Sequence, residues 1–305
     1  MEAIENKEER VKLEPGNTYF FICFALVCGG KSTFFDQITS QANSDQNKDK
    51  YNINIVSSDK IREDLSIQMQ KKNPNMTFKQ CFDKVGKETA KKFDQEIRNA
   101  INNRKQDKIN IILVDKNYPQ GIDKFLKFFC KDKNSQFFLV FIPRIKKPID
   151  INGLRFPFSL EYFIQCYLRL KNRHGHEVLN GEDENSKLVY LSFFKLFQNF
   201  DFFLKIYTNE EYAQNVFLQT IDFTDENKEI EVNTDVTEFF NNVIRHLKAF
   251  DMDNIKQNHE SEINKFFGVI EEKYDGKNFF ADTRELIKNQ VQDLLEKGII
   301  IKKDK

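Results

Sequence analysis

A short glycine-containing stretch near the start of the chain has the residue types and spacing of a phosphate-binding loop. Residues 25–33 read Ala-Leu-Val-Cys-Gly-Gly-Lys-Ser-Thr, which fits the pattern of Gly or Ala, four residues, then Gly-Lys-Ser/Thr. In such loops, converging backbone amides and a helix N-terminus bind phosphate oxygens. We expect Lys31 to reach the β- and γ-phosphates of ATP or GTP, and Ser32 to ligate Mg²⁺. The residues expected to bind the nucleotide are Ala25, Cys28, Gly29, Gly30, Lys31, Ser32 and Thr33.

An acid and an arginine follow the second apolar run of the chain at helical spacing. After Tyr51–Val56 the sequence reads Ser-Ser-Asp-Lys-Ile-Arg, so Asp59 and Arg62 lie three residues apart. Strand ends line the ligand crevice of a doubly wound sheet. In that position Asp59 can accept a proton from an incoming hydroxyl, and Arg62 can bind a phosphate of the acceptor. A helix N-cap is the alternative role for Asp59, and one residue can serve both.

Asp115 ends the third apolar run, Ile109–Val114. From the end of a strand beside the phosphate loop, its carboxylate can hold a magnesium-bound water or orient Arg62. The alternative is an ordinary strand-end aspartate before the turn at Tyr118–Pro119. We expect Asp115 to be the second metal-site residue beside Ser32.

Two arginines lie four residues apart in the segment 158–176. Arg169 and Arg173 share one face if this segment is helical. Two guanidiniums on a mobile helical hairpin can close over a polyphosphate and neutralise the charge that develops in transfer. The alternative is a solvated basic helix face. We expect Lys31, Asp59, Arg62, Arg169 and Arg173 to be the catalytic set.

Apolar runs and helical segments alternate in the first two thirds of the chain, as is typical of a doubly wound parallel sheet. The fold class predicted is therefore α/β, with a sheet of the type found in P-loop NTPases. Strands are expected at Tyr19–Val27, Tyr51–Val56, Ile109–Val114 and Gln136–Pro143. Helices are expected at Lys31–Gln41, twice within 60–106 with a break at Asn73–Pro74–Asn75, and at Ile122–Cys130, Phe158–Asn172 and Ser186–Leu204.

Three segments follow from this pattern. Residues 1–17 form a polar leader, and residues 18–205 form a P-loop kinase-like domain with a helical lid near 158–185. Residues 206–305 form a mainly helical C-terminal extension, with helices expected at Thr237–Phe250, His259–Glu272 and Thr283–Lys297.

The overall charge balance does not indicate a protein that wraps duplex nucleic acid, which is usually basic. The chain has 47 basic and 47 acidic residues, but residues 60–108 carry 13 against 7 (+6) and residues 209–240 carry 1 against 9 (−8). Five cysteines without a CxxC pair indicate a reducing compartment, cytoplasmic or nuclear. The first apolar run, Tyr19–Val27, is too short for a membrane span.

Three motifs in this order resemble the polynucleotide 5′-hydroxyl kinase family. They are the phosphate loop, the Ser-Ser-Asp-x-x-Arg stretch and the Arg-x-x-x-Arg pair. The sequence is more similar still to the kinase module of plant- and fungal-type tRNA ligases, through Asp115-Lys116-Asn117 and through Pro157-Phe158-Ser159-Leu160 ahead of Arg169, Arg173 and His174. The resemblance covers about residues 19–205. Ala25 departs from it, since the family usually has glycine there.

The resemblance implies a kinase that transfers the γ-phosphate of ATP or GTP to the 5′-hydroxyl of RNA, in RNA repair or tRNA splicing. It implies that Asp59 is the general base, that Arg62 and Asn117 bind the acceptor, and that the arginine pair grips the donor. Two alternatives stay open. One is a small-molecule or protein kinase on the same scaffold, and the other is a nucleotide-binding or vestigial subunit of a larger assembly.

Two further motifs are assigned no chemistry. Lys273-Tyr274-Asp275-Gly276 spells the nucleotidyl-acceptor pattern of ligases, but too few residues follow to form the domain that would hold the nucleotide. His174-Gly175-His176 can ligate zinc, but no third ligand is placed near it in the sequence. A turn and a polar lid loop are the preferred interpretations.

Overall fold

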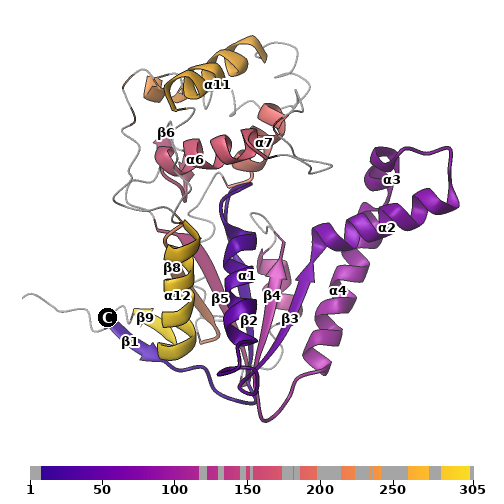
Figure 1. Cartoon of the computed structure of the whole chain (residues 1–305), viewed down its shortest axis with the longest axis vertical. Helices are drawn as coiled ribbons and strands as arrows, with labels where there is room; N and C mark the ends of the chain where they lie inside the picture. Colours follow the sequence, from indigo (N-terminus) through magenta and orange to yellow (C-terminus); the bar gives the residue numbers. More distant parts are fainter. Residues whose placement is uncertain are drawn as a thin grey trace, which may run out of the picture.

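A five-stranded parallel sheet forms the centre of the protein (Figure 1). The computed structural model describes residues 8–116, 122–129, 134–144, 149–151, 154–173, 181, 186–197, 214–223, 232, 234, 236–238, 240–241, 260–274 and 283–302. The sheet order is β3-β4-β2-β5-β8. Its strands are β2 (Thr18–Cys23), β3 (Tyr51–Ser57), β4 (Ile109–Asp115), β5 (Gln136–Pro143) and β8 (Val216–Ile221). This confirms an α/β fold with a parallel sheet.

Strand register brings the carboxyl ends of the central strands to one edge. Ile22 on β2 is level with Val114 on β4 and with Val140 on β5. Ser57, the last residue of β3, is level with Asp115, the last residue of β4. Side chains that follow these strands are therefore brought together at this edge, where ligands bind in sheets of this kind.

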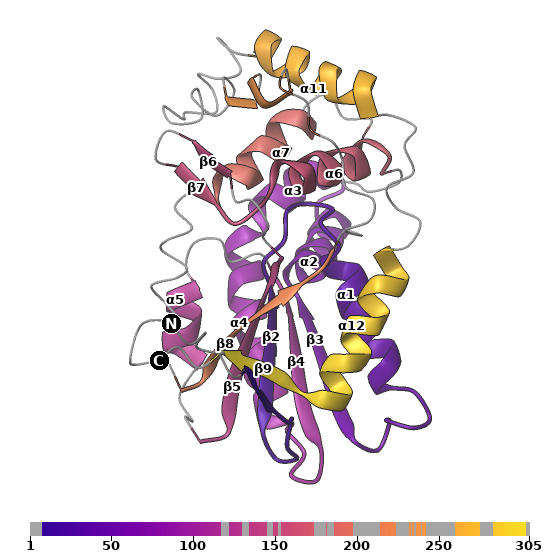
Figure 2. The ribbon, with the colours of Figure 1, turned by 90° about the vertical axis from the view of Figure 1, so that its left-hand side faces the viewer.

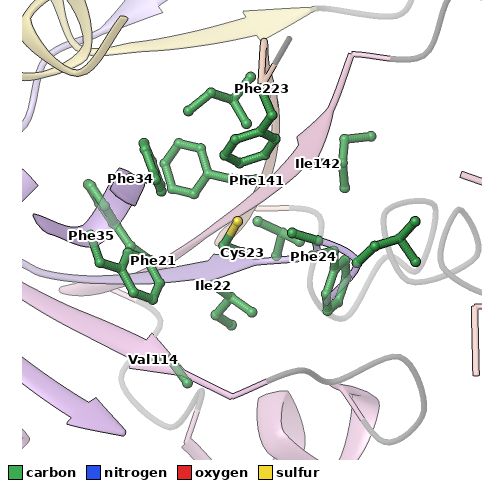
Figure 3. Packing of buried hydrophobic residues seen from close by; sticks show 14 of the residues in the cluster. Phe21, Ile22, Cys23, Phe24, Phe34, Phe35, Val114, Phe141, Ile142 and Phe223 are labelled. Carbon is green, nitrogen blue, oxygen red and sulfur yellow. The ribbon is translucent and has the colours of Figure 1, made fainter. Parts of the chain in front are cut away.

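Helices cover both faces of the sheet because β2 and β5 are apolar on both sides. Phe20 and Phe138 stack at 4.5 Å and face Phe125 of α5. On the opposite face, Phe34 of α1 packs against Phe141 at 4.7 Å, as Figure 3 shows. Figures 1 and 2 place α1 and α12 on this second face, and α4 and α5 on the first. Their bounds are α1 (Lys31–Ala42), α4 (Gly86–Asn102), α5 (Ile122–Phe129) and α12 (Thr283–Lys297).

A second helical layer lies beyond the carboxyl ends of the strands (Figure 2). It contains α6 (Leu160–Lys171), α7 (Ser186–Lys195) and α11 (Glu260–Tyr274), together with the short hairpin of β6 (Ile149–Ile151) and β7 (Leu154–Phe156). Glu271 of α11 joins the three helices. It accepts a hydrogen bond from the Tyr167 hydroxyl of α6 and forms an ion pair with Lys187 of α7 at 3.3 Å.

Residues 58–102 form three helices where the sequence predicts two. They are α2 (Ser58–Lys72), α3 (Phe78–Lys84) and α4, and α2 and α3 project from the side of the sheet (Figure 1). Thr77 is the N-cap of α3 and forms a capping box with Gln80. The extra break falls at Val85, directly before Gly86, the first residue of α4.

Five of the described strands, β1, β6, β7, β8 and β9, lie in segments where the sequence predicts none. β1 (Glu8–Val11), within the expected polar leader, pairs antiparallel with β9 (Ile299–Lys302) near the other end of the chain. β8 pairs with β5 in the central sheet although it belongs to the 206–305 segment. The polar residues Gln219 and Thr220 interrupt its apolar run, which is why the pattern is weak.

Of the helices expected after residue 205, two are confirmed. Thr283–Lys297 is α12 with the same bounds, and α11 covers the expected 259–272 segment. Most of 237–250 lies outside the described residues. Within the described part of the chain, none of the helices combines the length and the apolar character needed to cross a bilayer.

Phe34 should be the residue that anchors α1 to the sheet. It is 1% exposed, whereas Phe128 of α5 is 39% exposed. We predict that Phe34→Ala lowers the free energy of unfolding by about 3–5 kcal/mol, as truncating a buried phenylalanine does. Phe128→Ala should lower it by less than about 1 kcal/mol. Urea denaturation of both variants measures this, and equal losses would show that α1 is not held by this contact.

Candidate active site

The chain turns sharply between β2 and α1. Gly29 donates its amide to the Leu26 carbonyl at 2.9 Å, which closes a turn directly after the sheet. Cys28 and Gly30 both have positive φ, 60° and 99°. α1 begins at Lys31, immediately after Gly30. The strand, tight loop and helix expected from the sequence are therefore present around residues 25–33.

The backbone conformation of this loop requires glycine at both position 29 and position 30. Gly30 is the N-cap of α1 in the left-handed region, and a Cβ there would lie 2.7 Å from the Phe223 ring. A Cβ on Gly29 would overlap the Tyr162 hydroxyl. The first amides of any helix lack intrahelical partners, and Gly30 has no side chain to cap those of α1. Such amides, at the positive end of a helix, suit a bound anion.

The loop forms one wall of a cavity of about 380 Å³. The cavity is lined by residues from six separate parts of the chain. They are the loop residues 26–33, Asp59 in the first turn of α2, Asp115 at the end of β4, Arg169 of α6 with Arg173 just beyond that helix, Phe193 of α7, and Thr283 and Arg284 of α12. Most of the side chains assigned to the site from the sequence therefore face one cavity.

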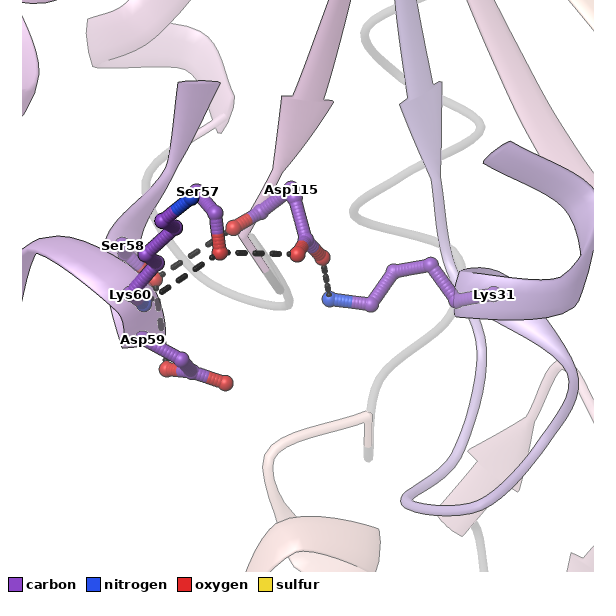
Figure 4. A network of polar contacts seen from close by, with 6 residues as sticks. All are labelled: Lys31, Ser57, Ser58, Asp59, Lys60 and Asp115. Atoms are coloured by element: carbon purple, nitrogen blue, oxygen red, sulfur yellow. Dashed lines mark hydrogen bonds and ion pairs between the residues drawn. The ribbon is translucent and has the colours of Figure 1, made fainter. Parts of the chain in front are cut away.

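A chain of polar contacts joins the loop to the start of α2, as Figure 4 shows. Lys31 Nζ lies 2.5 Å from Asp115 Oδ1. Asp115 Oδ2 accepts a hydrogen bond from the Ser57 hydroxyl at 2.8 Å. Ser57 is the N-cap of α2, and its Oγ accepts from the Lys60 amide at 3.4 Å. Ser57 thus takes the capping role, and Asp59, in the first turn, is exposed to the cavity.

Arg62 does not line the cavity in this structure. Its Nε donates to the Phe82 carbonyl at 3.0 Å, and its guanidinium lies 3.8 Å from the centre of the Phe82 ring. Asp59 and Arg62 both lie on α2. Because a helix turns about 100° per residue, side chains three residues apart do not point in the same direction. The side chain expected to bind the acceptor is held against α3 instead.

Of the other residues assigned to the site from the sequence, some line the cavity and some do not. Ala25 is fully buried and packs beneath the loop, outside the cavity wall. Ser32 is exposed at the cavity and Thr33 is half-buried there. Asn117 and the histidines at 174 and 176 lie outside the described residues.

Helix α6 and Arg173, two residues beyond its end, contact the loop at three points. The Tyr162 hydroxyl donates to the Gly29 carbonyl at 2.9 Å. Arg169 donates to the Cys28 carbonyl at 3.4 Å, and Arg173 lies 3.9 Å from the Cys28 sulfur. Arg169 also donates to the Thr283 hydroxyl at 3.1 Å. Both arginines therefore lie at the loop, but α6 ends at Lys171, so they do not share a helix face as expected from their spacing.

Burial shapes the acid–base character of groups beside the loop. It raises the pKa of the Tyr162 hydroxyl well above its usual range, so this group remains a hydrogen-bond donor to Gly29. Burial also raises the pKa of Cys28, and the neighbouring Arg173 partly opposes that rise. The deeper thiols Cys23 and Cys166 have a pKa of about 12 because both are fully buried.

The oxygen atoms present fit a magnesium ion bound together with a nucleotide. Mg²⁺ in such sites takes one or two protein oxygen ligands plus phosphates and water. The Ser32 hydroxyl and the Asp115 carboxylate both face the cavity. Among the described residues there is no group of three or more His, Cys, Asp or Glu able to hold a metal ion without such help.

Sequence reasoning missed five residues around the loop. Tyr162 and Phe223 pack on its glycines, and Phe193, Thr283 and Arg284 line the cavity. None belongs to a short motif, because each reaches the loop through tertiary packing. The Pro-Phe-Ser-Leu stretch before α6 was the nearest signal for Tyr162, which lies two residues after it.

Comparison with solved structures finds distant similarities. A solved structure described as a crystal structure of fungal RNA kinase matches with a TM-score of 0.34 and 13% sequence identity. The match covers 88% of this chain and 52% of the other, so the chain spans about half the length of that protein. No protein-family model and no curated protein matches the chain. At this TM-score the similarity supports no conclusion about fold or activity.

Gly30→Ala should destabilise the protein because an L-residue is strained at a φ of 99° and its Cβ would contact Phe223. We predict a loss of at least about 1–2 kcal/mol in the free energy of unfolding. The matched control is Gly268→Ala in the middle of α11, where nothing lies within 4 Å. That substitution should stabilise the protein by about 0.5–1 kcal/mol. A neutral Gly30→Ala in urea denaturation would contradict the loop conformation described.

Cys28 provides a chemical reporter of the cavity. We predict that saturating Mg²⁺–ATP or Mg²⁺–GTP slows its alkylation, because Cys28 lines the cavity. Since only the thiolate reacts and burial raises the pKa of Cys28, alkylation should be slow at neutral pH and faster at alkaline pH. Peptide mapping by mass spectrometry follows the rate, with buried Cys23 and Cys166 expected to stay unlabelled. An unchanged Cys28 rate at saturating nucleotide would place the nucleotide elsewhere.

Proposed function

We propose that the protein is a magnesium-dependent kinase that transfers the γ-phosphate of ATP or GTP to a hydroxyl group, with the 5′-hydroxyl of RNA as the preferred acceptor. The observation that supports this most is the cavity itself. It places an acid at a helix start, Asp59, in the same enclosure as a glycine loop, a lysine and two arginines. Phosphoryl transfer requires positioning and charge neutralisation more than covalent chemistry, and these groups supply both.

The donor phosphates would bind along the loop. The uncapped amides at the start of α1 would donate to phosphate oxygens, and Lys31 would turn from Asp115 toward the β- and γ-phosphates. Ser32 and Asp115 would hold Mg²⁺, which when bound neutralises phosphate charge. The Lys31–Asp115 pair keeps both side chains in place until the nucleotide arrives.

Asp59 would act as the general base. Its carboxylate takes the proton of the acceptor hydroxyl while the acceptor oxygen forms a bond to the γ-phosphorus. The bond from that phosphorus to the β,γ-bridging oxygen breaks, and the nucleoside diphosphate leaves with the electron pair. Ser57 accepts the α2 capping bond, so Asp59 is left available for this role.

Arg169 and Arg173 would neutralise the charge on the transferring group. In the structure they contact Cys28, on the loop that would carry the phosphates. A shift from the Cys28 carbonyl and sulfur to phosphate oxygens replaces weak, long contacts by charge-assisted hydrogen bonds. Such a shift would make the α6 segment the closing element of the site.

The RNA acceptor rests on the resemblance of the sequence motifs to polynucleotide kinases and tRNA ligase kinase modules. It fits a role in RNA repair or tRNA splicing, in the cytoplasm or nucleus. Arg62 would then have to leave Phe82 to reach an acceptor phosphate. Its present position favours a second candidate, transfer to the hydroxyl of a small molecule, which needs no anchor for an adjoining phosphate.

Asp59→Asn should abolish most phosphate transfer without weakening nucleotide binding. We predict that it reduces γ-phosphate transfer from labelled ATP or GTP to a 5′-hydroxyl RNA oligonucleotide by at least about 10²-fold, the usual contribution of a general base. Nucleotide affinity should stay within about threefold of the wild type, because the proposed role of Asp59 is toward the acceptor hydroxyl and not toward the donor phosphates. Asp64→Asn, an exposed acid on the same helix, is the matched control and should leave transfer unchanged.

The acceptor is decided in the same assay by replacing the RNA with 5′-hydroxyl DNA and with free nucleosides or sugars. Transfer to small molecules alone would establish the second candidate. Unimpaired transfer by Asp59→Asn would show that another group is the base. Bound nucleotide without transfer to any acceptor would indicate a nucleotide-binding subunit instead of an enzyme.

A further inference from the structure

The last helix of the chain contributes to the cavity, although nothing in the sequence motifs assigns it a role. Thr283 and Arg284, the first two residues of α12, line the same space as Lys31 and Asp59. We propose that the start of α12 forms the nucleoside end of the donor site, where Arg284 contacts the nucleobase and Thr283 positions Arg169. This inference rests on the proposed function.

The order of the strands places different residues at the two ends of the cavity. The loop follows β2, which is the central strand. Asp59 and Asp115 come from β3 and β4, on one side of β2. Phe223, which follows β8, lies on the other side, and Arg169 contacts both its carbonyl (3.4 Å) and Thr283 (3.1 Å). A triphosphate on the loop that directs its γ-phosphate toward Asp59 must extend its nucleoside away from Asp59, toward α12.

Helix α12 is fixed firmly beside the loop. Its buried residues Ile287, Val291, Leu294 and Leu295 face the protein, and Gln41 at the end of α1 donates to the Lys288 carbonyl at 2.7 Å. Gln290 pairs with both backbone groups of Asp222, at 2.8 and 2.9 Å. Asp222 precedes Phe223, the ring that covers Gly30. The start of α12 is thus held at a defined place relative to the phosphate loop.

Arg284 has the chemistry to contact a nucleobase. Its side chain is exposed, and it makes no hydrogen bond or ion pair with any described residue. Guanidinium groups stack on aromatic rings and donate to ring nitrogens and carbonyls. Thr283 plays a different part, because its hydroxyl accepts from Arg169 and holds that guanidinium at the loop.

Binding of ATP or GTP compared with inorganic tripolyphosphate tests the nucleoside contact. Arg284→Ala should weaken Mg²⁺–nucleotide binding by about three- to thirtyfold, the range of a cation–π contact, and leave tripolyphosphate binding unchanged. Lys288→Ala, an exposed cation one turn further along α12, is the control and should change neither affinity. Lys31→Ala should weaken both ligands, since it acts on phosphates.

Each other outcome overturns the assignment. If Arg284→Ala weakens neither ligand, the nucleoside lies elsewhere. If it weakens both equally, Arg284 binds phosphates instead of the nucleobase. If the wild type binds neither nucleotide nor tripolyphosphate, the proposed function itself fails and this inference fails with it. Calorimetric titration with the full chain separates these cases.

Thr283 is tested by its own pair of variants. Thr283→Ala should weaken binding of both nucleotide and tripolyphosphate severalfold, because Arg169 loses a hydrogen bond that directs it to the loop. Thr283→Ser keeps the hydroxyl and should restore both affinities to the wild-type values. If Ser and Ala behave alike, the hydroxyl does not position Arg169 and the role assigned to Thr283 is wrong.

Discussion

The ion pair between Lys31 and Asp115 is the contact on which the site depends. It joins the first residue of α1 to the last residue of β4, and Asp115 in turn holds Ser57 at the start of α2. Both side chains are largely shielded from water, at 16% and 22% exposure. Removal of either partner would leave the other charge uncompensated in a poorly solvated place. The pair therefore sets the distance between the loop that would bind phosphates and the helix that presents Asp59.

The C-terminal third of the chain is part of this arrangement. β8 extends the central sheet, Phe223 covers Gly30, and α12 packs on α1. α11 ties the helical layer together through Glu271. β9 pairs with β1, so the two ends of the described chain hold one another. The loop is thus enclosed by segments far apart in sequence, and its conformation depends on their packing.

Much of the central fold could be predicted because local patterns of apolar and polar residues determine it. β4 and α12 lie within one residue of the bounds expected from the sequence, whereas β2 ends at Cys23 instead of Val27 because the chain turns there into the glycine loop. The glycine loop was predictable because its residue types are imposed by a left-handed backbone at Gly30. β8 could not be predicted, because polar residues interrupt its apolar run and it is a strand through its pairing with β5.

For the candidate site, the sequence identifies the residues that belong to motifs and misses those that arrive by packing. Lys31, Asp59, Asp115, Arg169 and Arg173 line one cavity. Arg62 faces Phe82 because α3 folds back on α2, a contact that helical spacing alone cannot anticipate. Thr283 lies more than one hundred residues from Arg169, and only the packing of α12 on α1 brings the two together.

Amide hydrogen exchange of the 28–34 segment, with and without Mg²⁺–nucleotide, tests most directly whether the glycine loop binds phosphates. Within this segment the amides of residues 31–33, at the start of α1, lack intrahelical partners, so they should exchange readily in the free protein. Saturating ATP or GTP should slow their exchange markedly, with little change at the distant β1–β9 pair. Unchanged exchange in residues 28–34, or slowing confined to other segments, would contradict phosphate binding by the loop.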